Sequence, residues 1–393
     1  MVTQAKPSLE NANDDGAASP PDWEAIRREF PTTERFVYLD IARKAILPRE
    51  VERAMHDWLS DVYENAGGNA FSMERVEGTR RAVAEVFGAP PECLALIKNT
   101  SEGMNIIAQG FPWHPGDNVV ISESEHENNT LPWRHLRHRG IELRVAEPDA
   151  EGRVTLEQYR ELVDARTRIL STAWVTYGNG YRADLASLST FCRERDIKLV
   201  VDGIQAVGVL ATPIAALGVD ALVAGGHKAQ FSLAGAGFLY ATPEMIETIT
   251  PPYAAKFSFT SNDRTQPAPE LAHDGHRFEY GNPNFLGTWI QRRSAAFIRD
   301  IGLDHIEARV CALTTHLIER AEEVQIKVRT PRPWAERAGI VSFDVGGRAS
   351  EAVARLRERS VVVSEKDGHL RVAAHFYNSE DDLDRFLRAL RLV

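Results

Sequence analysis

The chain has 393 residues, of which 43% are hydrophobic and 26% are charged, and its formal net charge is −10 at pH 7. This length exceeds one small core and the composition is that of an ordinary globular protein, so we expect two domains and exclude a disordered or fibrous chain. The negative charge argues against nucleic acid or an anionic membrane surface as a partner.

The cysteines and the start of the chain bear on the cellular compartment. The three cysteines are widely spaced and form no CxxC pair: Cys93, Cys192 and Cys311. This usage favours a reducing, cytoplasmic setting without a zinc or redox motif. No run reaches the roughly 18 to 20 apolar residues that span a bilayer, and the start carries no signal peptide. We predict that the polar residues 1–21 form a flexible tail.

From residue 22 to 286 the pattern predicts an N-terminal arm and a large α/β domain. Apolar residues recur at helical spacing between Pro48 and Phe87, which predicts amphipathic helices. Short β-branched runs then alternate with helical segments. The expected strands are Leu94 to Lys98, Asn118 to Ser122, Ile141 to Val145, Arg168 to Thr172, Lys198 to Asp202 and Ala221 to Ala224. Such alternation predicts a mainly parallel sheet that is covered on both faces.

Residues 287–393 have a different pattern, which predicts a small α+β domain. A long helical stretch comes first, over Ile290 to Ile301 and His305 to Glu322. Three short strands follow, at Ile340 to Val345, Val361 to Ser364 and Leu370 to Ala374, and a helix from about Glu380 to Leu392 closes the chain.

The most informative segment runs from Val219 to Lys228 and reads VDALVAGGHK. The two glycines allow a tight turn after a buried strand, which places His227 and Lys228 at the edge of the sheet. A partly desolvated lysine has a lowered pKa and can attack an aldehyde as the neutral amine. The alternative is an ordinary surface lysine after a turn.

Two other strand ends carry suitable partners for such a lysine. Asp202 ends the strand that begins at Lys198 and can keep a pyridine nitrogen protonated. Thr100 and Ser101 open a helix whose free N–H groups suit a phosphate. The alternatives are helix capping by Asp202 and by the two hydroxyls.

His126 follows another strand and can lie over an aromatic cofactor ring. The alternatives are a loop histidine and a metal ligand, and no HExxH or similar spacing supports a metal.

In this order, the motifs resemble the class V aminotransferase family, the cysteine desulfurase-like branch of the fold-type I enzymes that use pyridoxal 5′-phosphate (PLP). The match is carried by the GGHK segment and the following Gly235-x-Gly237, and the likeness runs from about Tyr38 onward. It implies a seven-stranded, mainly parallel sheet and a homodimer with shared sites. It also implies a role for each candidate residue. Lys228 would form a Schiff base with PLP, Asp202 would pair with the pyridine nitrogen and Gln205 would hydrogen-bond the phenolic oxygen. His126 would stack on the ring, and the phosphate would be held by Thr100, Ser101 and His227.

The same resemblance assigns the substrate side and shows where this chain departs from the family. Arg371 is implied to bind the substrate carboxylate, and Asn282 stands where a threonine of the neighbouring subunit commonly reaches the phosphate. Tyr177 replaces an asparagine of some relatives, and Arg43 stands where small or neutral residues are usual, either as a second anion contact or as a surface charge. Desulfurases need a cysteine just before the arginine, and residues 361–368 contain none.

The missing cysteine argues against persulfide chemistry and favours C–S bond cleavage in an S-substituted cysteine. Loss of this cysteine also resembles isopenicillin N epimerase-like and ergothioneine-lyase-like members and the sulfur-tailoring enzymes of lincosamide antibiotic pathways. The same residues would serve an aminotransferase, an epimerase or a decarboxylating deaminase. A PLP-fold protein that has lost catalysis and only binds is the alternative from another class.

Overall fold

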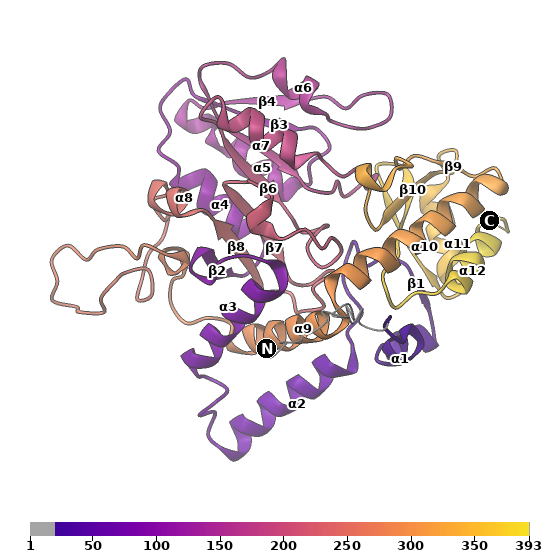
Figure 1. Cartoon of the computed structure of the whole chain (residues 1–393), viewed down its shortest axis with the longest axis horizontal. Helices are drawn as coiled ribbons and strands as arrows, with labels where there is room; N and C mark the ends of the chain where they lie inside the picture. The colour runs from indigo at the N-terminus through magenta and orange to yellow at the C-terminus, as the bar shows by residue number, and fades with distance from the viewer. Residues whose placement is uncertain (1–19, 393) are drawn as a thin grey trace, which may run out of the picture.

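The computed structural model describes residues 20–392. The predicted flexible tail, residues 1–21, therefore lies outside the described part except for its last two residues. Figure 1 shows a large lobe built around one sheet and a smaller C-terminal lobe, with α9 and α10 leading from one to the other. No helix within residues 20–392 has the length and apolar character that a bilayer crossing requires.

The large lobe holds the predicted seven-stranded sheet. Its strands are β2 (Leu94–Ile97), β3 (Asn118–Ser122), β4 (Glu142–Ala146), β5 (Thr167–Ala173), β6 (Lys198–Asp202), β7 (Ala221–Gly225) and β8 (Gly237–Ala241). The order is β2-β8-β7-β6-β5-β3-β4, and only β8 runs antiparallel to its neighbours. The mainly parallel, seven-stranded sheet is confirmed, although the sequence patterns did not predict β8 as a strand.

Both faces of this sheet are buried, which explains why its strands carry apolar residues at consecutive positions. Within β6, Leu199 and Val201 pack into one hydrophobic cluster while Val200 packs into another on the opposite face. The helices are α1 (Trp23–Arg28), α2 (Arg49–Glu64), α3 (Met73–Phe87), α4 (Thr100–Gly110), α5 (Leu131–His135), α6 (Leu156–Arg160), α7 (Leu185–Arg193), α8 (Pro243–Thr248), α9 (Phe285–Ile301), α10 (Leu303–Glu323), α11 (Ala349–Glu358) and α12 (Glu380–Leu390).

The C-terminal lobe is an antiparallel sheet of four strands covered by α10, α11 and α12. Its strands are β9 (Lys327–Val328), β10 (Ile340–Asp344), β12 (Ser364–Lys366) and β13 (His369–Ala373), in the order β12-β13-β10-β9. The single strand predicted at 361–364 is wrong in detail, because the chain changes partner there. Val361 and Val362 form β11, which pairs with β1 (Val37–Tyr38), whereas Ser364 joins β13.

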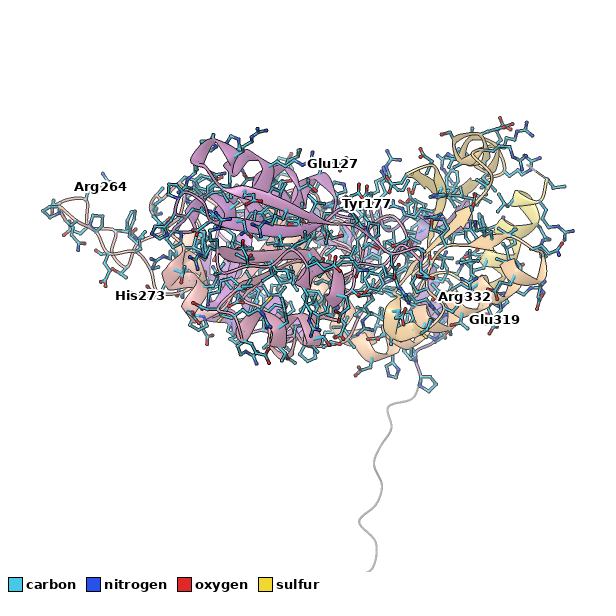
Figure 2. All side chains as sticks on the ribbon, turned by 90° about the horizontal axis from the view of Figure 1, so that it is seen from above. Glu127, Tyr177, Arg264, His273, Glu319 and Arg332 are labelled. Atoms are coloured by element: carbon cyan, nitrogen blue, oxygen red, sulfur yellow. The ribbon has the colours of Figure 1, made fainter. Side chains whose placement is uncertain are left out.

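The N-terminal arm thereby belongs in space with the C-terminal lobe. The pairing of β1 with β11 is parallel, and an isolated bridge joins Asp40 to Ala373. Arg27 of α1 reaches Asp382 of α12, with Nη1 2.6 Å from Oδ2. The predicted division at residue 287 falls inside α9, which packs along α2 and α3. Seen from above, Glu127 and Tyr177 lie beside the junction of the two lobes (Figure 2).

Candidate active site

The lysine segment turns sharply at the end of β7, as its glycines predicted. A Cβ on Gly226 would lie 2.8 Å from the carbonyl oxygen of Ala236, and one on Gly237 would lie 2.6 Å from that of Ala224. Only glycine allows this close approach of backbones. The turn leaves Lys228 with 8% of its surface exposed. Because Lys228 is buried, the surface-lysine alternative is wrong. Among residues 20–392 no hydrogen bond or ion pair reaches Lys228 Nζ.

Lys228 and Asp202 lie together because β6 and β7 are neighbours and both end at this edge. Burial lowers the pKa of Lys228 to about 8, although the nearby charge of Asp202 acts the other way. Burial also raises the pKa of Asp202 to about 6. Asp202 Oδ1 accepts from the N–H of Ile204 at 3.0 Å, but turns rather than a helix follow, so the helix-cap alternative does not hold. The structure therefore juxtaposes a buried amine and a buried carboxyl group.

Gln205 and His227 flank this pair and connect it to the N-terminal arm. Gln205 is buried, and its Nε2 donates to the carbonyl of Ala42 at 3.0 Å. The carbonyl of His227 accepts from the N–H of Ala45 at 2.8 Å. Burial, and next the charge of Lys228, lower the pKa of the His227 ring. These two contacts fix the turn after Asp40 against the lysine segment.

The start of α4 has an unsatisfied hydroxyl. Thr100 is buried, and its Oγ1 has no hydrogen-bond partner among the described residues. The helix is capped instead by Asn99, whose Oδ1 accepts from the N–H of Glu102 at 2.9 Å. Ser101 Oγ donates to Asn128 Oδ1 at 2.9 Å. The simple capping role considered for Thr100 and Ser101 is therefore wrong, and the Thr100 hydroxyl has no partner within residues 20–392.

His126 and Tyr177 face each other with ring centroids 5.2 Å apart and planes at 80°. His126 Nδ1 accepts from the N–H of Asn128 at 3.2 Å, which places the ring proton on Nε2. Burial lowers the pKa of His126, so the ring is neutral at pH 7. Within residues 20–392 no group of three or more His, Cys, Asp or Glu side chains is arranged to hold a metal ion.

Sequence reasoning missed Glu125. This carboxyl group is buried, accepting from Asn129 Nδ2 and from the N–H of Ala173, both at 2.7 Å. Burial raises its pKa to about 8, and the charge of Asp202 acts in the same direction. Glu125 is thus protonated at neutral pH beside a carboxyl group that ionises more readily. Its sequence, Ser-Glu-Ser-Glu-His, has the polarity of an exposed loop and carries no signal of burial.

Arg371 is buried together with Asp40, each with 2% of its surface exposed. Its Nη2 lies 3.2 Å from Asp40 Oδ1, its Nε donates to Ser364 Oγ at 3.1 Å and its Nη1 donates to the carbonyl of Tyr177 at 3.0 Å. A guanidinium has five N–H donors, so two remain for another acceptor. Arg371 is held rigidly and still has capacity to bind a carboxylate.

Arg43 and the Tyr177 hydroxyl occupy the outer part of the site. Arg43 is exposed on the turn after Asp40, and its side chain makes no ion pair within residues 20–392. The Tyr177 hydroxyl donates to Asp367 Oδ1 at 3.3 Å. This contact holds the tyrosine against the turn that joins β12 and β13.

That turn is the shortest that can join two strands. Asp367 and Gly368 have φ values of 52° and 76°, and two successive positive φ angles are typical of a two-residue hairpin. Lys366 and His369 pair directly across it. No loop is present here to carry a cysteine. Cys93 and Cys192 are buried elsewhere, with pKa values that burial raises.

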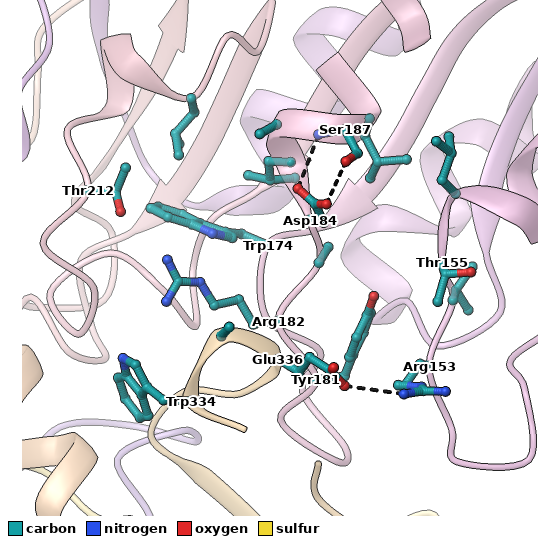
Figure 3. Close-up of a pocket in the computed structure, with 18 of the residues that line it drawn as sticks. Arg153, Thr155, Trp174, Tyr181, Arg182, Asp184, Ser187, Thr212, Trp334 and Glu336 are labelled. Atoms are coloured by element: carbon teal, nitrogen blue, oxygen red, sulfur yellow. Dashed lines mark hydrogen bonds and ion pairs between the residues drawn. The ribbon is translucent and has the colours of Figure 1, made fainter. Parts of the chain in front are cut away.

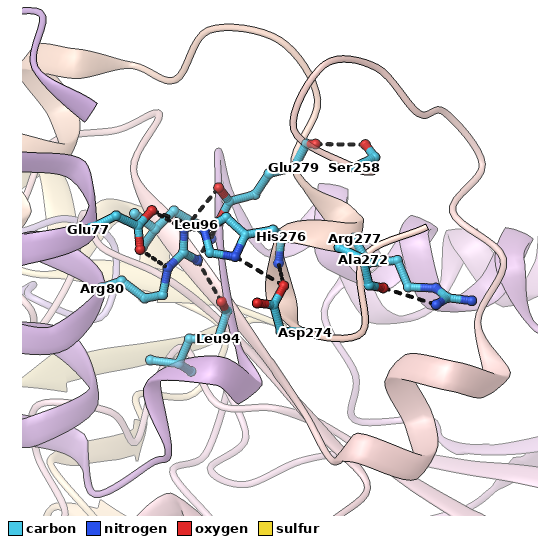
Figure 4. A network of polar contacts seen from close by, with 10 residues as sticks. All are labelled: Glu77, Arg80, Leu94, Leu96, Ser258, Ala272, Asp274, His276, Arg277 and Glu279. Atoms are coloured by element: carbon cyan, nitrogen blue, oxygen red, sulfur yellow. Dashed lines mark hydrogen bonds and ion pairs between the residues drawn. The ribbon is translucent and has the colours of Figure 1, made fainter. Parts of the chain in front are cut away.

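Asn282 does not meet Lys228 within one chain. It is exposed and lines a pocket of about 330 Å³ with Lys98 and Tyr280. The segment before it is fixed by Arg80, which binds the Glu279 carboxylate with Nη1 2.6 Å from Oε1 (Figure 4). The predicted contribution of Asn282 to a neighbouring subunit's phosphate site stays a prediction.

A cavity of about 860 Å³ lies apart from Lys228. Trp174, Arg182 and Trp334 lie along one side of it, and Arg153 forms an ion pair with Glu336 on the other (Figure 3). None of the residues assigned to the site from the sequence lines this cavity. Cavity size is therefore a poorer guide here than the distribution of buried polar groups.

Comparison with known proteins gives consistent matches over nearly the whole chain. The model of the aminotransferase class-V family matches residues 37–389. A probable cysteine desulfurase of Pyrococcus abyssi is 28% identical over 391 residues, covering 93% of this chain and 96% of that protein. The apo structure of a cysteine desulfurase from Thermococcus onnurineus has a TM-score of 0.85 at 26% identity, covering 94% of this chain and 97% of that one. A cystine C–S lyase solved with cysteine persulfide has a TM-score of 0.84 at 21% identity, covering 92% and 99%, a similarity of fold.

Proposed function

This chain belongs to the class V aminotransferase family, and from that premise we propose that it is a PLP-dependent lyase that cleaves the C–S bond of an S-substituted cysteine. The reaction consumes water and releases a thiol, pyruvate and ammonia. The family resemblance derived from the sequence is confirmed, and with it PLP as the cofactor.

The residues at the sheet edge fit PLP by their chemistry. A buried amine without a partner suits the aldehyde, and an unsatisfied buried hydroxyl at a helix start suits the phosphate: Lys228 and Thr100. When bound, PLP supplies an electron-withdrawing ring that stabilises negative charge at the substrate α-carbon. Asp202 holds the proton at the ring nitrogen that this role requires. Glu125, being protonated, adds no second negative charge beside Asp202.

Lys228 moves the α-proton. With a pKa of about 8, about a tenth of the amine is neutral at pH 7, and this fraction can act as a base. His126 is neutral, so its ring packs against an aromatic surface without adding positive charge. Gln205 keeps one N–H for the phenolic oxygen after donating to Ala42.

Arg371 orients the substrate by its carboxylate. Two N–H donors remain on its Nη atoms, and these can form the paired hydrogen bonds that a carboxylate accepts. Asp40 and Ser364 fix the guanidinium in place, which limits the entropy lost on binding. The amino acid is thereby held with its α-carbon toward Lys228.

One observation carries the choice of a lyase over a desulfurase: the two-residue turn at Asp367 and Gly368. A desulfurase transfers sulfur to a cysteine on a loop at this place, and here no such loop exists. The departing sulfur then leaves as a free thiol. Although the similar proteins are named cysteine desulfurases, cysteine desulfuration is not proposed for this chain.

The test is to mix the PLP-loaded protein with a panel of S-substituted cysteines and to measure thiol, pyruvate and the cofactor absorbance. Stoichiometric thiol and pyruvate support the lyase. A spectral change without either product would replace it by an aminotransferase, epimerase or decarboxylating deaminase. No spectral change with any amino acid would favour a protein that only binds. A role in antibiotic biosynthesis stays a prediction.

We also propose the homodimer that the resemblance implies, with Asn282 reaching the partner's phosphate site. Asn282 is exposed and Arg80 fixes the segment that leads to it, which suits a contact across an interface. Sedimentation of the PLP-loaded protein should give twice the 43.8 kDa chain mass. A monomer with full lyase activity would contradict this arrangement.

A further inference from the structure

The hairpin that replaces the loop carries a cation that no role above uses. Ser364 pairs across the strands with Arg371, and Lys366 pairs with His369. Alternate residues of a strand and directly opposed residues share a face, so all four side chains project from the same face of the hairpin. Arg371 points into the site from this face. Lys366 therefore points to the same side, about 7 Å farther along the strand.

Lys366 is close to the reacting groups and has no partner of its own. Its charge contributes to the lowered pKa of both Lys228 and His126. No hydrogen bond or ion pair joins Lys366 Nζ to any of residues 20–392. Lys366 is half-buried, and its ammonium group repels the ammonium form of Lys228. No contact within the described residues compensates for this repulsion.

A pocket of about 420 Å³ adjoins Lys366 and Tyr177. Arg329 also lines it, without an ion pair among the described residues, and the buried Nδ1 of His369 has no hydrogen-bond partner there. Two acidic side chains also line this pocket: Glu123, which is exposed, and Asp367, which accepts from the Tyr177 hydroxyl.

We propose that Lys366 and this pocket bind a second anionic group on the substrate, so that the enzyme prefers cysteines whose sulfur substituent ends in a carboxylate. The identification of this ligand as a lyase substrate rests on the proposed function. Arg371 binds the α-carboxylate, and Lys366 binds the distal one. The spacing along the strand matches two anionic groups that several bonds separate.

Binding is tested apart from the reaction, by calorimetric titration of the PLP-loaded protein with glutarate and with butyrate. Neither compound has an amino group, so neither can react. Glutarate should bind about tenfold more tightly than butyrate, as expected for one charge-assisted contact. Lys366→Met should remove this difference and Lys366→Arg should keep it. Lys327→Met, which removes an exposed lysine paired with Asp344 outside the pocket, is the matched control and should also keep it.

Equal affinity for the two compounds in the unmodified protein, or a preference that survives Lys366→Met, would overturn the proposal. Turnover supplies the second measurement, with S-(2-carboxyethyl)cysteine and its neutral amide. The unmodified enzyme should favour the acid about tenfold in kcat/KM, and Lys366→Met should not. If neither compound releases thiol, the lyase assignment fails while the titration still decides whether Lys366 binds the second anion.

Discussion

Two buried arginines show how scaffold and site differ in this molecule. Arg80 directs all five of its N–H donors to acceptors within the chain: the carboxylates of Glu77 and Glu279 and the carbonyl of Leu94. Arg371, equally buried, directs three and keeps two. A buried polar group normally finds its partners in the protein. The amine of Lys228, which has no partner within residues 20–392, and the two spare donors of Arg371 belong to the site where we propose that a ligand binds.

Among substitutions in the candidate active site, Lys228→Ala should have the largest effect on turnover. Loss of the base and of the covalent attachment should lower turnover by at least about 10⁴-fold. Because no contact of Lys228 Nζ is lost, the melting temperature of the cofactor-free protein should stay within a few degrees of the parent. Thiol release and thermal unfolding measure the two effects. Full activity in this variant would end the assignment of Lys228.

On the scaffold side, Arg80→Met should lower the free energy of unfolding by about 3 kcal/mol, because it removes the counter-charge of the Glu279 carboxylate, whose side chain is only 10% exposed. Denaturant unfolding at pH 7 measures it. Arg53→Met, which removes an exposed pair, is the control and should change stability by less than about 1 kcal/mol. Equal losses of unfolding free energy in the two variants would show that the ion pair of Arg80 contributes no more to stability than the exposed pair of Arg53.

Arg371→Lys tests the donors that the site keeps. Lysine preserves the charge beside Asp40 but cannot present two parallel N–H groups to a carboxylate, so kcat/KM should fall about 30-fold. We expect most of this loss in KM, since the interaction forms on binding. A loss confined to kcat, with KM unchanged, would show that Arg371 does not bind the substrate carboxylate.

The smallest effect concerns Glu125 and pH. Its pKa of about 8 lies above the ordinary value of 4.5, so between these values the folded state binds a proton that the unfolded state has lost. Stability then falls as pH rises, by about 1 kcal/mol between pH 6.5 and 7.5. Glu125→Gln in the cofactor-free protein should remove this part of the slope. Identical slopes in chemical denaturation of the two proteins would show that Glu125 is ionised when folded.

Local patterns in the sequence were sufficient for most of the large lobe. β3 and β6 begin and end where predicted, because each has a central apolar run that is buried on both faces and is flanked by polar residues. The fold-type I architecture and the position of Lys228 at the sheet edge followed from the glycine turn and the family motif. β8 was missed because the GAG at its start, residues 235–237, resembles a loop.

Features that depend on distant contacts were not predictable in this way. Asp40 and Arg371 are 331 residues apart, and no local pattern indicates that they form a buried pair. The pairing of β1 with β11 depends in the same way on the assembled fold. So does the burial of Glu125, whose carboxyl group accepts from the N–H of Ala173. Asn99 was overlooked as the cap of α4 because the hydroxyls after it are equally good capping residues.

The tight turn at Asp367 and Gly368 also makes the scaffold a natural recipient for a graft. A hairpin end exposed to solvent accepts inserted residues at little thermodynamic cost, since closing a longer loop costs only about 0.6 kcal/mol per doubling. A cysteine-bearing segment inserted between Lys366 and His369 would add a thiol at this end of the hairpin and leave the residues of β12 and β13 unchanged. Sulfur transfer in such a chimera would mean that lyase and transferase differ here by the length of one connection.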